Sequence, residues 1–379
     1  MVAGQPYDRL FARVATRGCL RREFIWQDDR EARVVGKKRI NLALQGGGAH
    51  GAYTWGVLDR LLMERDLEIA AISGTSAGAL NGAAVKAGII EDGHDGARAR
   101  LDWLWQEVGA RPEFHLGQWM WPFSLSTFSH ALEMSPMFMA VDAWSRVVSP
   151  YSYGPLYQNP LEPIVSQFNF DDVCAERGVG PCLFICATKV RDGKVRVFKD
   201  SEISTNVILA SACLPTIFRA VSIEDPATGT PDDYWDGGYT GNPALFPLFS
   251  DGLPEDILII NINPLERNDT PRSAQDIQNR INEISFNSSL LRELRAIEFV
   301  QRLLASGALQ PGEMSRVFVH MIADDGLMNE LSVATKLIPT PYTLSRLKEA
   351  GQRSADAFLS EHWGDLNTRS TVDLVKMFQ

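Results

Sequence analysis

A serine framed by glycines, between a strand pattern and a helix pattern, constrains the fold of this chain most. The motif is Gly74-Thr75-Ser76-Ala77-Gly78, with the apolar run 67–72 before it and the alanine-rich run 77–87 after it. We therefore predict a buried strand, a sharp turn at Ser76 and a helix. Gly74 and Gly78 let the two elements pass close together, and the serine oxygen then lies at a positively polarised helix N-terminus. The motif predicts a nucleophile, although small residues at a tight turn also occur for packing reasons alone.

Strand and helix patterns alternate along most of the chain. Helical patterns lie between and after the strands, notably over 274–306 and 343–362. This alternation predicts an α/β fold with a mainly parallel sheet covered on both faces. Functional sites of such sheets lie at the carboxyl ends of the strands, where both glycine motifs of this chain occur. The strands are expected at 40–44, 67–72, 183–189, 195–198, 257–263 and 317–322.

A second glycine motif follows the first strand and opens a helix. It reads Gly46-Gly47-Gly48-Ala49-His50-Gly51, and its backbone N–H groups can converge on one anionic point. The motif also matches the dinucleotide-binding pattern, which needs an acidic residue roughly 20 residues further on. Three acidic residues near that offset do not end a second strand, and this interpretation leaves the serine motif unexplained, so we favour an oxyanion hole. The three residues are Glu64, Asp66 and Glu68.

A serine nucleophile also needs a proton acceptor. None of the downstream histidines lies in a glycine-flanked turn after a strand. Asp236, in Tyr234-Trp235-Asp236-Gly237-Gly238-Tyr239, is the better candidate, although Asp-Gly is also an ordinary turn pair. Burial would have to raise its proton affinity for such a role. The histidines considered are His94, His115, His130, His320 and His362.

These motifs, together with Ala210-Ser211-Ala212-Cys213-Leu214-Pro215, resemble the patatin-like phospholipase family over about residues 39–247. The resemblance implies a three-layer α/β/α fold and a lipid acyl hydrolase that needs no metal and no cofactor. It implies that Ser76 is the nucleophile and Asp236 the base, without a histidine. It also implies that Gly46, Gly47 and Gly48 form the oxyanion hole, with Gly51, Gly74, Gly78, Gly237 and Gly238 supporting the motifs.

One position departs from that family. Where the family usually has a basic residue, commonly arginine, this chain has His50, which is mostly neutral near pH 7. A catalytically weak lipid-binding module with a hydrolase fold is therefore a second interpretation. The expected substrate is a phospholipid or a related acyl ester, and the sequence does not specify which one.

The composition excludes several other classes. The formal net charge of −10 over 379 residues argues against nucleic acid as the main partner. No apolar run approaches the ~20 residues of a transmembrane helix, and we see no secretory signal. The five scattered cysteines fit reduced thiols rather than disulfides or zinc, so we expect a cytoplasmic protein.

The chain divides into three expected parts. Residues 1–38 form a basic arm with arginines at every fourth position, which fits a membrane surface, or a solvated arm packing on its own domain, which we favour. Residues 39–264 form the catalytic core, with an aromatic-rich, cap-like insertion over about 101–170. That insertion fits either an apolar pocket or interfacial surface, or a hydrophobic cluster of its own. Residues 265–379 form a helical extension packing on the core, and the oligomeric state stays open.

Overall fold

The computed structural model describes residues 37–110, 124–168, 179–225, 229–267, 270–272, 274–310 and 312–379. The arginines of the expected basic arm and residues 111–123 of the expected insertion lie outside these residues. Lys37–Gln379 forms one compact unit. The strands are β1 (Lys38–Leu44), β2 (Leu67–Thr75), β3 (Cys182–Lys189), β4 (Val195–Lys199), β5 (Val221–Asp225), β6 (Thr230–Asp236), β7 (Asp256–Ile260) and β8 (Phe318–Ile322).

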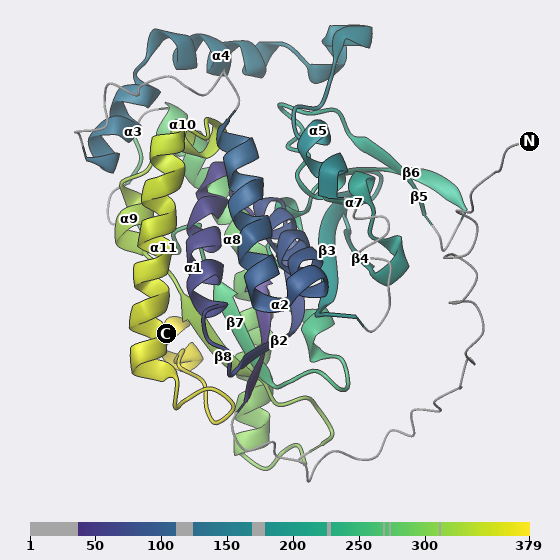
Figure 1. Cartoon of the computed structure of the whole chain (residues 1–379), viewed down its shortest axis with the longest axis vertical. Helices are drawn as coiled ribbons and strands as arrows, with labels where there is room; N and C mark the ends of the chain where they lie inside the picture. The colour runs from purple at the N-terminus through teal and green to yellow at the C-terminus, as the bar shows by residue number, and fades with distance from the viewer. Residues whose placement is uncertain are drawn as a thin grey trace, which may run out of the picture. The chain divides into compact units, whose positions relative to one another are not determined.

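Among the described residues, the strands form a single sheet with the order β5-β6-β3-β2-β1-β7-β8, and β4 pairs with β3 (Figure 1). The neighbours from β3 through β2, β1 and β7 to β8 are parallel. The pairs β3–β4, β3–β6 and β5–β6 are antiparallel. The predicted mainly parallel sheet is confirmed, with an antiparallel part at one side.

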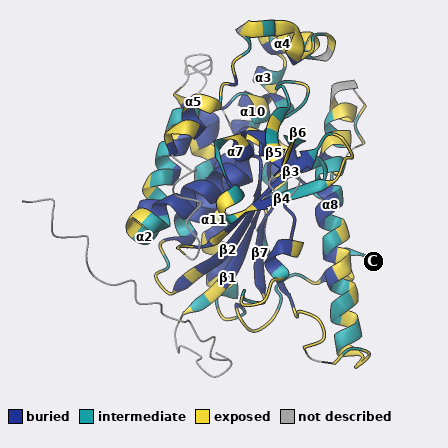
Figure 2. Cartoon of the chain, turned by 90° about the vertical axis from the view of Figure 1, so that its right-hand side faces the viewer, coloured by how far each residue is buried: buried dark blue, intermediate teal, exposed yellow. Residues whose placement is uncertain are grey.

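Helices cover both faces of this sheet, as Figures 1 and 2 show. The α-helices are α1 (Gly51–Leu61), α2 (Ala77–Gly109), α3 (Leu125–Glu133), α4 (Pro136–Val147), α5 (Glu162–Val165), α7 (Thr205–Ser211), α8 (Ala274–Ala305), α9 (Asp325–Asn329), α10 (Val333–Leu337), α11 (Pro341–His362) and α12 (Leu374–Met377). The 3₁₀ helices are η1 (Gly48–His50), η4 (Pro150–Leu156), η5 (Ser166–Phe168), η6 (Asp200–Glu202), η7 (Gly237–Tyr239) and η8 (Phe246–Phe249).

Alternation along β1 separates the two layers of the core. Leu42 and Leu44 belong to the cluster that contains buried residues of α1, α2 and α11. Ala43 belongs to a second cluster with Leu290 and Leu294 of α8. Successive side chains of a strand point to opposite faces, so the sheet lies between two helical layers. The fold is a three-layer α/β/α sandwich.

The first part of the expected insertion belongs to the core. Residues 101–109 continue α2, and Trp105 is buried, with its ring stacked on Trp55 at a centroid distance of 6.3 Å. The indole N–H of Trp105 donates to Asn81 Oδ1. The described cap segment therefore begins at α3, and α4 follows it.

The C-terminal extension does more than cover the sheet with helices. Its strand β8 pairs with β7 and extends the sheet, which the prediction of a strand at 317–322 anticipated. Its helix α11 packs along α1. Its short helix α10 packs against both η1 and α3, so this extension contacts the glycine loop.

Candidate active site

Ser76 lies at the turn between β2 and α2. Its backbone has a positive φ of 54°, with ψ at −121°, a conformation that side chains normally avoid. The turn needs glycine because a Cβ atom on Gly78 would lie 2.1 Å from the carbonyl oxygen of Leu44. The backbone N–H of Ser76 donates to Ser211 Oγ over 2.9 Å. The predicted strand, turn and helix are therefore present, with the serine in a strained position.

Sheet register places Asp236 beside this turn. Thr75 pairs with Cys186 on β3, and the next residue of β3, Ala187, pairs with Asp236 at the end of β6. Thr75 Oγ1 donates to the carbonyl oxygen of Gly241 over 2.6 Å. The serine turn and the aspartate loop are thus joined through one shared strand and one direct hydrogen bond.

The carboxyl group of Asp236 is buried and only partly hydrogen-bonded. Its Oδ1 accepts the N–H of Gly238 over 2.7 Å, whereas Oδ2 has no partner of good geometry among the described residues. Burial raises the pKa of Asp236 to about 7, although the Gly238 amide and the nearby Ser76 hydroxyl favour its charged form. A carboxylate with this pKa can accept a proton at neutral pH.

The glycine loop after β1 lies against the serine. A Cβ atom on Gly46 would lie 2.7 Å from Ser76 Cβ, so a side chain there would collide with the nucleophile. The Gly46 N–H donates to Asn242 Oδ1 over 2.7 Å. Gly46 therefore gives its amide to Asn242, which leaves Gly47 and Gly48 as the candidate oxyanion donors of the expected three.

His50, at the end of this loop, is buried and neutral. Its Nε2 lies 2.9 Å from Thr335 Oγ1, which itself donates to the carbonyl oxygen of Ser332. Because the hydroxyl has one hydrogen to give, Nε2 must carry the imidazole proton, and Nδ1 has no described partner. Burial, and secondly the charge of Lys336, hold the pKa of His50 well below its usual range. The imidazole therefore adds no positive charge at neutral pH.

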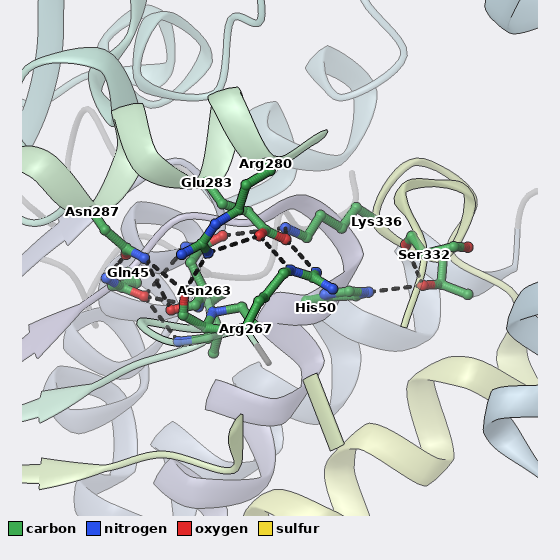
Figure 3. A network of polar contacts seen from close by, with 12 residues as sticks. Gln45, His50, Asn263, Arg267, Arg280, Glu283, Asn287, Ser332 and Lys336 are labelled. Carbon is green, nitrogen blue, oxygen red and sulfur yellow. Dashed lines mark hydrogen bonds and ion pairs between the residues drawn. The ribbon is translucent and has the colours of Figure 1, made fainter. Parts of the chain in front are cut away.

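A polar network behind the loop joins it to the C-terminal extension (Figure 3). Asn263 Nδ2 donates to the carbonyl oxygen of Gly46 over 2.8 Å, and Lys336 Nζ donates to Asn263 Oδ1 over 3.4 Å. Gln45 Oε1 accepts three hydrogen bonds from the backbone and side chain of residues 262–263. The buried carboxylate of Glu283 faces the Lys336 ammonium at 3.6 Å.

The residues that a dinucleotide site would need lie elsewhere. Glu64, Asp66 and Glu68 are all at the amino end of β2, away from the glycine loop, and Glu68 forms an ion pair with Arg39. His320 is buried in β8 and hydrogen-bonded to Asp256. These groups do not meet the loop or Ser76.

Three further observations concern other predicted sites. Cys182, Cys186 and Cys213 are free thiols. Over the described part of the chain, no group of three or more histidine, cysteine or acidic residues could hold a metal ion. Within the same part, every helix is too short or too polar to cross a bilayer.

Sequence reasoning missed the residues that support the site. Ser211 lies in the block 210–215 that carried part of the resemblance, and Asn242 closes the aspartate loop, so both had a signal. No sequence signal marked Lys336 and Asn263, because tertiary packing alone brings their segments to the glycine loop.

The chain is similar to known proteins in sequence and, more distantly, in structure. The sequence model of the patatin-like phospholipase family matches residues 42–249. No curated protein sequence matches the chain significantly. Similar solved structures include VipD from Legionella pneumophila, with 13% identity, a TM-score of 0.39 and coverage of 86% of this chain and 67% of that one.

Two more structures show the same distant similarity. One is the complex of SpcU with ExoU from the type III secretion system of Pseudomonas aeruginosa, with 12% identity, a TM-score of 0.29 and coverage of 85% of this chain and 53% of that chain. The other is human GIVD cytosolic phospholipase A2 in complex with methyl gamma-linolenyl fluorophosphonate, with 11% identity, a TM-score of 0.31 and coverage of 86% and 60%. The chain thus spans between about half and two thirds of these proteins.

Proposed function

Because the chain belongs to the patatin-like phospholipase family, a family of lipid ester hydrolases, we propose that it cleaves carboxylic ester bonds of phospholipids or related acyl esters through Ser76 and Asp236. The observation that carries the proposal is the pairing of a strained serine with a buried carboxyl group whose pKa is about 7. A base with a pKa near the working pH is suited to activate a hydroxyl nucleophile. The lysophospholipase and phospholipase A activities both fall within this proposal.

The reaction begins with attack of Ser76 Oγ on the ester carbonyl carbon. The carboxylate of Asp236 takes the hydroxyl proton as the new C–O bond forms. The tetrahedral oxyanion accepts hydrogen bonds from Gly47 and Gly48, close to the positively polarised N-terminus of α2. Asp236 then gives its proton to the leaving alcohol as the ester C–O bond breaks, which yields the acyl-enzyme.

Hydrolysis of the acyl-enzyme repeats these steps with water. Asp236 takes a proton from the water, whose oxygen attacks the acyl carbonyl. Collapse of the second tetrahedral intermediate releases the fatty acid and returns the proton to Ser76. Each proton thus passes through one carboxyl group, and the proposal requires no histidine.

We further propose that helix α4 forms the surface that meets lipid. Five apolar side chains on this helix are exposed, although Phe138 is buried. The indole N–H of Trp144 donates to the hydroxyl of Tyr153. Such amphipathic aromatic groups favour the boundary between water and hydrocarbon. Helix α3 connects this surface to α10 and so to the glycine loop. The exposed residues are Met137, Met139, Val141, Trp144 and Val147.

A fluorophosphonate probe tests the catalytic proposal directly. Wild-type protein should be labelled on Ser76 and should hydrolyse soluble and phospholipid esters, whereas Ser76→Ala should do neither. Asp236→Asn should remain folded and lose ester hydrolysis. Equal labelling of wild type and Ser76→Ala would exclude Ser76 as the nucleophile.

The neutral state of His50 supports the second candidate, a lipid-binding module with weak catalysis. The same experiment separates the two. Vesicle binding without labelling of Ser76 and without turnover on an ester panel would favour the binding module.

A further inference from the structure

The glycine loop has a neutral histidine where it meets the C-terminal extension, and a lysine lies next to it. His50 is uncharged, yet the positive charge of Lys336 is close enough to lower the pKa of that imidazole. Lys336 comes from α10, more than 280 residues further along the chain. Positive charge at this loop is therefore supplied by the extension and not by the loop itself.

Helix α10 lies directly on the loop. A Cβ atom on Gly48 would lie only 2.4 Å from the carbonyl oxygen of Lys336, so the two backbones are in contact. Asn263 Oδ1 accepts a hydrogen bond from the Lys336 ammonium. The same oxygen lies 3.7 Å from the point that a Cβ atom of Gly47 would occupy. The ammonium group is thus one side chain away from Gly47, one of the two candidate oxyanion donors.

Lys336 shares one buried carboxylate with two arginines. Glu283 is a single buried carboxylate, and it faces Arg267 through two hydrogen bonds of 2.8 and 2.6 Å, Arg280 at 3.4 Å and Lys336 at 3.6 Å. Burial acts to raise the pKa of Glu283, but the hydrogen bond of Arg267 and the other cations lower it, so the carboxylate stays ionised. Arg267, Arg280 and Lys336 all face this carboxylate, and the charge of Asp276 also acts on Arg267. Burial lowers the pKa of Lys336, and Glu283 partly offsets this by favouring the charged ammonium.

Positive charge close to a developing oxyanion stabilises the transition state in a site that excludes water. Lys336 also donates a hydrogen bond to Asn263 Oδ1, and Asn263 Nδ2 donates to the carbonyl oxygen of Gly46. We propose that Lys336 is a positioning residue for the reaction, which fixes the glycine loop through Asn263 and supplies the positive charge that His50 lacks. This inference rests on the proposed function, because it needs Ser76 to form an oxyanion.

The test compares Lys336→Met with Lys336→Arg and with the double variant His50→Arg/Lys336→Met. With a soluble short-chain ester, Lys336→Met should lower kcat about 10- to 100-fold and change KM much less, because the lost charge acts on the transition state. Lys336→Arg should recover most of this loss. The double variant moves the cation into the loop and should recover about tenfold over Lys336→Met.

Lys348→Met is the matched control. Lys348 is another lysine of the extension with a similar exposure of 22%, against 19% for Lys336, and it pairs with Asp102. It lies on α11, outside the network of Figure 3. Its substitution removes an ion pair and should leave kcat at the wild-type level.

Three outcomes would overturn the inference. The first is a wild-type kcat in Lys336→Met. The others are a loss of kcat in Lys336→Arg, or in Lys348→Met, as large as the loss in Lys336→Met. If the double variant does not fold, the kcat values of Lys336→Met and Lys336→Arg still test the inference. Calorimetry then checks that these two variants have the same Tm. A wild-type chain that neither labels nor hydrolyses esters overturns the proposed function and this inference together, whereas an active wild type with an unaffected Lys336→Met overturns this inference alone.

Discussion

The backbone N–H of Ser76 donates a hydrogen bond to the side-chain oxygen of Ser211. The Ser211 hydroxyl in turn donates to the carbonyl oxygen of Cys186 over 2.6 Å. One buried hydroxyl therefore joins the strained turn to β3, the strand that also pairs with the aspartate strand.

Removal of this hydroxyl should loosen the turn. Ser211→Ala leaves one buried donor and one buried acceptor without a partner, which costs about 1–3 kcal/mol. We expect a lower free energy of unfolding in urea and roughly tenfold slower fluorophosphonate labelling of Ser76. Ser222→Ala, at an exposed position on β5, is the control. Wild-type stability and labelling in Ser211→Ala would contradict the role of this hydrogen bond.

The activity should depend on pH through Asp236. The carboxyl group must be ionised to accept the proton of Ser76, and its pKa is about 7. We therefore expect kcat/KM to rise tenfold per pH unit well below pH 7 and to level off above it. A pH profile on a soluble ester between pH 5 and 9 measures this. A flat profile over that range would argue that another group limits the reaction.

The same carboxyl group should cost stability at high pH. Its folded pKa lies above its unfolded value, so the folded state binds the proton more tightly, and stability is lost as the pH rises from about 4 to 7. Asp236→Asn removes the buried charge and should be more stable than wild type at pH 8 by about 2–4 kcal/mol. This gain should disappear near pH 4. Urea denaturation at both pH values measures the difference, and no gain at pH 8 would refute the raised pKa.

Asn242 should control the geometry of the glycine loop. Its side chain accepts the N–H of Gly46 over 2.7 Å and donates to the carbonyl oxygen of the same residue. Asn242→Ala removes both contacts and should lower kcat by about 10- to 100-fold, since oxyanion donors act only when well placed. Asn282→Ala, exposed on α8, is the control. Equal kcat values in the two variants would show that the loop holds its shape without Asn242.

The exposed face of α4 should govern activity on membranes but not the chemistry. Trp144→Ser/Val147→Ser removes two apolar side chains that are 57% and 84% exposed. We expect weaker binding to phospholipid vesicles and slower vesicle hydrolysis, each by about tenfold, with unchanged hydrolysis of a soluble ester. Phe299→Ser, 50% exposed on α8, is the matched control. Equal losses in both variants, or a loss on the soluble ester, would assign α4 another role.

The sequence predicted the parts of the fold that depend on local pattern. The glycine-framed serine required a strand, a turn and a helix, and β2, the turn at Ser76 and α2 follow that prediction. The two strands β5 and β6 were missed, because β5 is only partly buried and β6 begins with polar residues and Pro231. An edge hairpin of this kind is stabilised by its neighbour β3, which no local pattern reveals.

In the candidate site too, local sequence patterns predicted some residues, and tertiary packing determined the others. The motifs supplied Ser76, Asp236 and the glycine loop, since each needs glycine at a close contact or tight turn. They also assigned Gly46 as an oxyanion donor, but its amide is taken by Asn242. The involvement of Lys336 and Glu283 could not be predicted, because only the packing of α8 and α10 brings them to the loop.

The register between β1 and β2 fixes the relative position of the two catalytic motifs. Leu44 pairs with Gly74, so the strand before the glycine loop and the strand before the serine are neighbours in one hydrogen-bonded ladder. The segments that carry the reacting groups are therefore held in register by the backbone hydrogen bonds of the sheet, while α3 and α4 attach outside that ladder. Substitutions on the exposed face of α4 should therefore alter the contact with lipid without changing the register of the two catalytic strands.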